Sequence, residues 1–248
     1  MKKMLLIMLL FLTACTNGGP ADDSSGENTD QSEESTEAAP EEQQTSEESE
    51  EEMSAADIIK NAQSEGSKEV SYEERQTTTI STEERQHVIR TITTRSKQDE
   101  IKIAVDDGTD IKTHYIFEGE HFIYQNGDVE RQDDGRNIEG SSYGDLISQL
   151  EPFKEGTAEQ LESGYEIRYE VEGEAGVKPF INDDLESSLE AVDHINGLVL
   201  LKFNEDYRYE SAELTLTMEM DDETINVSSN ITMDKIGEIN VIEKPKGM

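Results

Sequence analysis

The sequence predicts an α+β domain. It has one strongly curved antiparallel β-sheet, a half-barrel of about 9–10 strands, with two or three helices on its concave side. Most of the chain after residue 70 alternates apolar and polar residues with a period of two, which is typical of strands with one buried face. Short turns containing Gly, Asn or Asp separate these runs, as in β-hairpins. Stretches with helical periodicity are few and short.

The first residues have the layout of a bacterial lipoprotein signal peptide, 1–14. Two lysines precede an apolar run, 4–12, which is too short to span a bilayer, since a spanning helix needs about 20 residues. Small residues at Thr13 and Ala14 then precede Cys15, the only cysteine. We expect a diacylglycerol anchor, with palmitate-like chains, on Cys15, which would hold the chain on the outer face of the cell membrane. The alternative is a short buried helix that ends in a cysteine.

The second predicted part, 15–53, is a disordered acidic linker. It is dominated by Glu, Ser, Thr and Gln and, after Cys15, contains neither an aromatic nor a basic residue. Such a segment cannot bury enough apolar surface to offset the entropy cost of ordering. We expect a solvated spacer between the membrane and the folded domain. A tail that collects cations or a basic partner is the alternative.

The charge of the chain restricts its partners. With 58 acidic and 21 basic residues, its formal net charge is −37. This argues against nucleic acid, which requires a basic surface, and against docking on anionic lipid head groups. Attachment to the membrane would therefore depend on the lipid. With a single cysteine, no intramolecular disulfide can form, so the folded domain must be held together by packing alone.

The folded domain, 54–248, opens with a short helix. Ser54 is a good cap, Asp57 stands three positions later where it returns the hydrogen bond, and Gly66 is expected to end the helix.

The strands follow this helix. Two polar, threonine-rich runs come first, at 70–80 and 88–94, and their β-branched residues favour strands. The next runs alternate strictly, at 101–105, 111–117, 165–171, 214–220 and 225–233. Turn residues separate the runs at 106–108, 118–119, 126–127, 133–135 and 221–222.

Two further helices are expected within the β-rich region. Residues 142–150 repeat the capping pattern, and 183–195 carries Leu185, Leu189 and Val192 on one side. The segment 157–160 is predicted to begin a single helical turn.

The predicted helices are too few for the predicted sheet. Nine or ten strands make a sheet roughly 45 Å wide, whereas each helix is about 10 Å across. The sheet must therefore curl around the helices. The part of its concave side that they leave uncovered forms an apolar cavity, unless the sheet closes further and fills it.

This order of elements resembles a group of Gram-positive lipoproteins of unassigned function. The group is similar to the lipoprotein-carrier superfamily, which includes LolA-like carriers and the LppX/LprG-like lipid-binding lipoproteins. The segments that carry the resemblance are the lipobox at 12–15, the helix at 55–62, the strands at 115–119 and 121–127, and the ending at 231–245. The resemblance implies a half-barrel whose concave face holds acyl chains, with no shared catalytic residues.

The sequence contains no recognisable catalytic or metal-binding motif. The four histidines have no spacing that places two on one helix face, although His114 and His121 could approach each other across a hairpin. Residues 106–110 resemble a calcium loop in composition alone and are better interpreted as a turn. No nucleophile elbow or phosphate loop occurs. We expect no enzyme activity, no cofactor and no metal; a hydrolase is the least favoured interpretation.

The favoured function is therefore binding of a lipid or other apolar ligand on the concave side, with ordinary core packing as the alternative for each lining residue. A second hypothesis is an acidic interaction or sensing module with a filled core that binds an envelope protein partner or cations. The expected cavity residues are Ile103, Tyr115, Phe117, Tyr124, Ile167, Tyr169, Leu185, Leu189, Leu216 and Met218.

Overall fold

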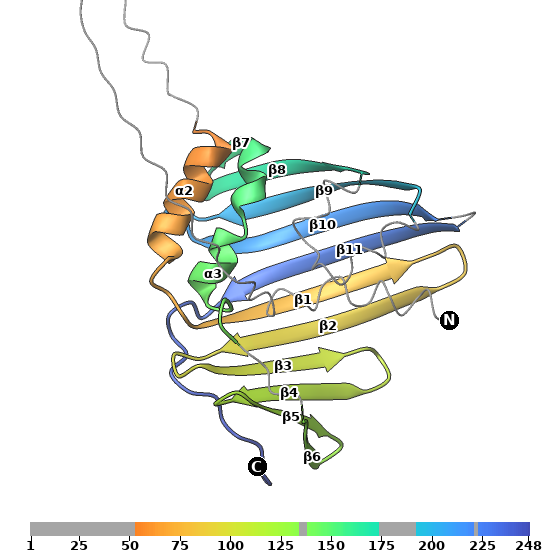
Figure 1. The fold of residues 1–248 in the computed structure, drawn as a ribbon. Helices are drawn as coiled ribbons and strands as arrows, with labels where there is room; N and C mark the ends of the chain where they lie inside the picture. The colour runs from red at the N-terminus through yellow and green to blue at the C-terminus, as the bar shows by residue number, and fades with distance from the viewer. Residues whose placement is uncertain (1–52, 134–137, 174–191, 221–222) are drawn as a thin grey trace, which may run out of the picture. The chain divides into compact units, whose positions relative to one another are not determined.

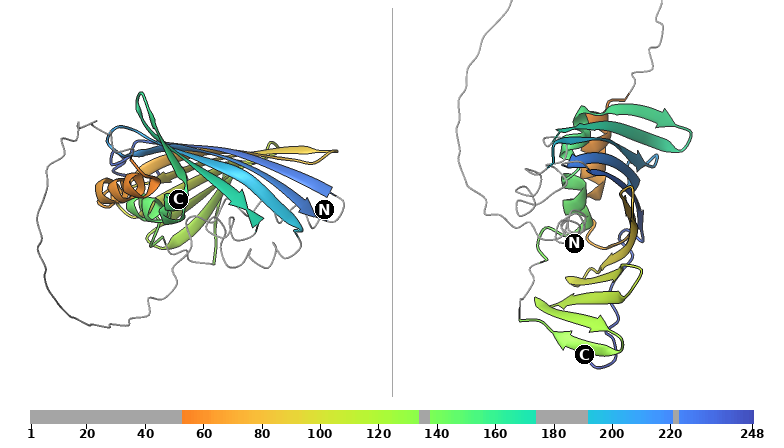
Figure 2. Two further views of the ribbon diagram at one scale, coloured as in Figure 1. Left: turned by 90° about the horizontal axis from the view of Figure 1, so that it is seen from above. Right: turned by 90° about the vertical axis from the view of Figure 1, so that its right-hand side faces the viewer.

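The computed structural model describes residues 53–133, 138–173, 192–220 and 223–248. These residues form one antiparallel sheet of eleven strands in the order β6-β5-β4-β3-β2-β1-β11-β10-β9-β8-β7 (Figure 1). In the described part of the chain the edge strands β6 and β7 do not pair, so the sheet is open, and it is visibly curved (Figure 2). The predicted fold class is confirmed.

The strands form two meanders, β1–β6 and β7–β11, which are joined where β1 pairs with β11. Within the described ranges, three short helices accompany them: α2 (Ala55–Gly66), α3 (Tyr143–Ser148) and the 3-10 helix η1 (Glu151–Glu155). The strands are β1 (Tyr72–Ser81), β2 (Gln86–Arg95), β3 (Glu100–Asp106), β4 (Ile111–Phe117), β5 (Glu120–Gln125), β6 (Asp128–Arg131), β7 (Thr157–Leu161), β8 (Gly164–Glu172), β9 (His194–Phe203), β10 (Tyr209–Met220) and β11 (Glu223–Asp234).

One element prediction is wrong, and so is the end of another, and the sheet has eleven strands where about 9–10 were expected. The segment predicted to start a helical turn is strand β7, because each of its residues pairs with β8 across a tight hairpin. The helix predicted at 183–195 lies mostly outside the described residues, and its last two residues, His194 and Ile195, begin strand β9 instead. Pairing with β8 on one side and β10 on the other fixes β9 as a strand.

The helix caps follow the predicted chemistry. The Ser54 side chain accepts a hydrogen bond from the backbone N–H of Asp57, and Ser142 and Asp145 form a full capping box at α3. Gly66 ends α2 for a different reason than expected. A Cβ there would lie 3.1 Å from the ring of Tyr143, so this glycine lets α2 and α3 pack closely.

The strand register defines two faces of the sheet. The inner face is the one that carries the helices, and it includes Ile80 of β1, Val227 of β11 and Leu216 of β10, which are paired across neighbouring strands. On the other side of β1, Arg95 is paired with Tyr72 and Ile101, so these side chains also belong to the inner face. The alternate residues of each strand form the outer face.

Candidate ligand-binding face

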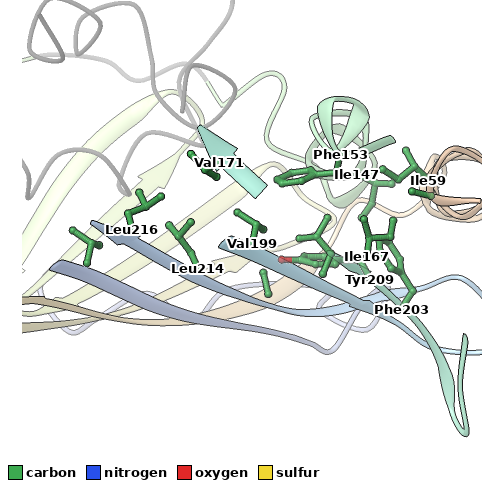
Figure 3. Close-up of a cluster of buried hydrophobic side chains, with 14 of the residues drawn as sticks. Ile59, Ile147, Phe153, Ile167, Val171, Val199, Phe203, Tyr209, Leu214 and Leu216 are labelled. Atoms are coloured by element: carbon green, nitrogen blue, oxygen red, sulfur yellow. The ribbon is translucent and has the colours of Figure 1, made fainter. Parts of the chain in front are cut away.

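The inner face carries the main hydrophobic core. Apolar side chains from β1, β2 and β8–β11 join those of the three helices in one buried cluster. Figure 3 shows Ile147 of α3 and Phe153 of η1 on the side of the sheet toward which Ile167 and Tyr209 point. The buried members from the strands include Ile80, Ile89, Ile167, Val171, Ile195, Val199, Leu201, Leu214, Leu216, Met218, Ile225 and Val227.

The helices are fixed to one end of the strands. The Tyr143 hydroxyl accepts a hydrogen bond from the backbone N–H of Tyr209 at 3.1 Å and lies 3.3 Å from the carbonyl oxygen of the same residue. The Phe153 ring meets the Tyr169 ring edge-on at 5.3 Å between centroids. Burial raises the pKa of the Tyr143 hydroxyl to about 12, so this anchor stays protonated. Figure 1 shows α2 and α3 across the same end of the sheet.

The apolar inner face continues well beyond this end. Ile80 stands at the opposite end of β1 from Tyr72, about 26 Å away at 3.3 Å per residue. Its neighbours there are Val227 on β11 and, one strand further, Leu216 on β10. In Figure 3, Leu214 and Leu216 lie along the sheet away from Phe153 and Ile147. The far half of the inner face therefore presents aliphatic side chains to whatever covers it.

The structure separates the expected cavity residues into groups. Ile167 and Tyr169 lie under the helices, and Leu216 and Met218 lie on the far half of the same face; all four belong to the main cluster. Ile103 is also on the inner face but is half-buried near the β3 edge of that cluster and is not among its members. Leu185 and Leu189 lie outside the described residues.

The three expected aromatic residues of β4 and β5 lie on the opposite face. Because Ile103 is paired with His114, the next residue, Tyr115, points outward, and so do Phe117 and Tyr124. There they pack with Ile242 in a second, smaller cluster. These aromatics and the inner-face residues therefore cannot line one cavity.

This outer cluster is covered by the C-terminal segment. The backbone N–H of Ile242 donates to Glu100 Oε2 at 2.8 Å, and the Lys244 ammonium lies 4.7 Å from the centre of the Phe117 ring. The alternation of β4 could not reveal this, since both of its faces carry large apolar residues.

Sequence reasoning also missed a polar strip on the inner face. Where β1, β2 and β11 meet, the inward positions are buried but polar. Gln76 Nε2 donates to Ser229 Oγ at 3.0 Å, and the Thr78 and Ser229 hydroxyls lie 2.9 Å apart. The signal available in the sequence was the unusual polarity of β1 and β2. We define the polar strip as Gln76, Thr78, Thr91, Thr93 and Ser229.

Two ionisable residues border the polar strip on the same face. Glu74 precedes Gln76 by one inward position on β1, and burial raises the pKa of its carboxyl group to about 7. Arg95 follows Thr93 by one inward position on β2 and is 4% exposed.

His114 and His121 do approach each other across the β4–β5 hairpin. Their Nδ1 and Nε2 atoms are 3.0 Å apart and their rings are stacked. Among the described residues, however, no group of three or more His, Cys, Asp or Glu side chains is arranged to hold a metal ion. The 106–110 segment is the β3–β4 turn, in which Asp107 accepts hydrogen bonds from the backbone N–H groups of Thr109 and Asp110.

No protein-family model matches this chain, and no curated protein does. Solved structures do show similarity. LprF from Mycobacterium bovis is 11% identical with a TM-score of 0.45, and the match covers 78% of this chain and 97% of that one. A LolA superfamily protein from Nitrosomonas europaea is 9% identical with a TM-score of 0.28, covering 77% and 96%. A putative outer membrane lipoprotein-sorting protein domain from Vibrio parahaemolyticus is 8% identical with a TM-score of 0.23, covering 71% and 90%.

One of these structures is named as a LolA superfamily protein and another as a lipoprotein-sorting protein domain. What each of them binds says nothing by itself about this chain, so its function has to be argued from its own residues. In the described part of the chain, no helix combines the length and the apolar character needed to cross a membrane.

Proposed function

We propose that this chain is a membrane-anchored extracytoplasmic lipoprotein that binds a lipid or another apolar molecule on the inner face of its sheet, without catalysis. The observation that supports the proposal most directly is the length of the apolar inner face compared with the helices that cover it. Strand β10 has 12 residues and is about 40 Å long at 3.4 Å per residue. Two helices packed side by side are only about 20 Å across.

The side chains of the far half suit acyl chains. The inward residues of β10 and β11 there include Leu216, Met218, Ile225 and Val227, and the charged residue at an inward position, Glu223, stands at the exposed start of β11. Aliphatic side chains attract an acyl chain through the hydrophobic effect, at about 0.8 kcal/mol for each buried CH₂ group. Gly197 of β9 lies between Leu216 and Val171, and a Cβ there would lie 2.6 Å from Leu216 Cδ2, so this glycine lets the Leu216 side chain lie over β9.

The membrane anchor is the second part of the proposal. Cys15 would carry the lipid, the acidic linker would act as a spacer, and the folded domain would work on the outer side of the membrane. A charge of −37 opposes adsorption to anionic lipid, so a covalent anchor with more than one acyl chain explains how such a protein stays at the surface.

The competing function is an acidic interaction module whose inner face is filled by its own side chains. On the outer face of β8–β10, however, Lys202 lies between Glu166 and Glu213, 3.9 and 3.1 Å from their carboxylates. Two of the acidic residues on these strands are therefore partly neutralised, which weakens the attraction of this part of the outer face for a cation or a basic partner.

The test uses the chain without residues 1–15, which keeps every described residue. Native mass spectrometry should find a bound lipid that organic solvent removes. The absence of tryptophan permits a second test with single tryptophans at adjacent positions of β10. A brominated fatty acid should quench the fluorescence of Leu216→Trp on the inner face and leave that of Thr215→Trp on the outer face unchanged.

Thermal melting followed by circular dichroism would establish that both tryptophan variants are folded. A native mass equal to that of the bare chain, together with no difference in quenching, would overturn lipid binding. Calcium calorimetry and pull-downs at low and high salt would then test the acidic module.

A further inference from the structure

Arg95 is a buried cation on the inner face with hydrogen-bonding capacity left over. Its side chain is 5% exposed, and Nη2 donates to Asp99 Oδ1 at 2.9 Å. Among the described residues, none provides an acceptor for the buried Nε and Nη1 atoms. Arginine cannot escape this cost by losing its proton, and buried donors are nearly always satisfied. A guanidinium group held in this way is suited to bind an anionic group, to which its free N–H groups can donate.

The surroundings of Arg95 lead from a charged position to an apolar one. Tyr72 and Ile101 flank it on the neighbouring strands, and Thr93 and Thr91 are the next inward residues on β2. From Arg95 to Thr91 the strand extends about 13 Å. The polar strip continues through Gln76, Thr78 and Ser229 to β11, where Val227 begins the aliphatic surface.

The order of these environments matches the order of chemical groups along an amphiphile. A charged head group fits the guanidinium, hydroxyl and ester groups fit the threonines and the amide of Gln76, and a hydrocarbon chain fits the aliphatic surface. Only arginine offers two parallel N–H donors to a phosphate or carboxylate. In a chain of charge −37 that repels anions in general, a buried arginine also gives one site where an anion is attracted.

We therefore propose that the ligand of the inner face is an anionic amphiphile and that Arg95 binds its phosphate or carboxylate through Nε or Nη1, each of which shares one edge of the guanidinium group with Nη2. This inference rests on the proposed function, since it specifies the chemical class of the lipid. Tyr72 and Glu74 are the inward-facing ionisable groups on the neighbouring strand β1, and Asp99 is the ion-pair partner of Arg95. The head group must compete with Asp99, whose own side chain is 80% exposed.

The experiment compares two ligands that share an acyl chain, using the chain without residues 1–15. Oleoyl-lysophosphatidylglycerol carries a phosphate and monooleoylglycerol does not. Each is titrated against a neutral fluorescent probe, N-phenyl-1-naphthylamine, bound to the protein. We expect the phosphate-containing ligand to displace the probe at a concentration about tenfold lower, which corresponds to about 1.4 kcal/mol. Inorganic phosphate alone should not displace it, which separates a lipid head group from a free anion.

Three variants assign this preference to Arg95. Arg95→Gln should bind both ligands equally and still bind the neutral one as the wild type does. Arg90→Gln is the matched control, because Arg90 lies on the same strand but on the outer face, and it should keep the preference. Asp99→Asn frees Nη2 and should increase the preference, and it keeps a residue type that tolerates the positive φ of 55° at this turn.

Each outcome has a distinct meaning. Equal displacement by the two ligands in the wild type, or an unchanged preference in a folded Arg95→Gln variant, would overturn the inference while leaving lipid binding intact. If Arg95→Gln does not fold, an Asp99→Asn variant with no change in preference would overturn it instead. Failure of every lipid and of the probe to bind would overturn the proposed function itself.

Discussion

The two faces of this sheet are covered by different segments of the chain. On the inner face, the three described helices cover one end of a cluster drawn from six strands, and the buried aliphatic side chains of this cluster continue beyond the helices. On the outer face, a short stretch of chain around Ile242 covers only the aromatic residues of β4 and β5. The comparison shows that the outer cluster is a local contact on two strands, whereas the inner cluster extends across six strands and beyond the helices that cover one end of it.

The largest effect is expected from shortening a side chain of the inner face. Ile167 is 0% exposed beneath the helices, so Ile167→Ala should lower the free energy of unfolding by about 3 kcal/mol, through lost transfer energy and the cavity left behind. The matched control is Ile111→Ala on the outer face. Ile111 is 60% exposed, and its truncation should change stability by less than about 0.5 kcal/mol. Urea denaturation measures both, and equal effects would contradict the assignment of the two faces.

A smaller and more local effect is expected at the outer cluster. Ile242→Ala should reduce the free energy that its packing on Tyr115 and Phe117 contributes by about 2 kcal/mol. Because this cover lies near one edge of the sheet, the loss should appear as local opening. Hydrogen exchange should accelerate in β4 and β5 and stay unchanged in β8–β10. The adjacent Val241 is 57% exposed, so Val241→Ala should leave exchange in β4 and β5 as in the wild type.

The sequence predicts the sheet well and the assignment of faces less well. Period-two alternation located β3, β8, β10 and β11, because each of these strands has one buried face, whereas β-branched residues located β1 and β2. In β4, by contrast, Tyr115 and Phe117 alternate with His114 and Ile116, and both sets are apolar enough to be buried. Pairing with β3 and contact with Ile242 decide between them, and neither is a local property of the strand.

The candidate site was predicted only in its apolar part. Ile167, Leu216 and Met218 follow from the alternation of their strands. Arg95 could not be recognised, because an arginine among threonines is normally a solvated residue of an exposed strand face. Its burial depends on register with Tyr72 and Ile101, which comes from tertiary structure.

Two consecutive glutamates of β1, one on each face of the sheet, should make opposite contributions to the pH dependence of stability. Glu74 faces inward, and burial raises its pKa to about 7. The folded state therefore holds this proton more tightly than the unfolded state does, and its contribution to stability is lost as the pH rises from about 4.5 to about 7. A pKa that differs by one between the folded and unfolded states corresponds to about 1.4 kcal/mol of stability. Because the side chain is partly exposed, we expect the free energy of unfolding of the wild type to fall by only about 2 kcal/mol over this pH range. Glu74→Gln should abolish this decrease.

Glu73 on the outer face is the control for this titration. Burial would raise its pKa, but the hydrogen bond from Lys235 at 2.8 Å and the charges of Lys235 and Arg75 outweigh burial and lower it. Its contribution is therefore present at neutral pH and lost as the pH falls through the lowered pKa. Urea denaturation across pH 4 to 8 should show that Glu73→Gln loses stability mainly at the upper end, whereas Glu74→Gln gains stability there. Parallel profiles for the two variants would refute the difference between the faces.

The smallest expected effect concerns the charged end of the outer cover. The Lys244 ammonium lies 4.7 Å from the Phe117 ring centre, within range of a cation–π interaction that contributes about 0.5–1 kcal/mol at an exposed site. Lys244→Met keeps most of the apolar stem and removes the charge, so exchange in β4 should accelerate by no more than about fivefold. Lys246→Met makes the same substitution at an exposed position two residues later and should have no effect. If both variants accelerate exchange equally, the change in net charge is responsible, and the contact of Lys244 with Phe117 does not stabilise the outer cluster.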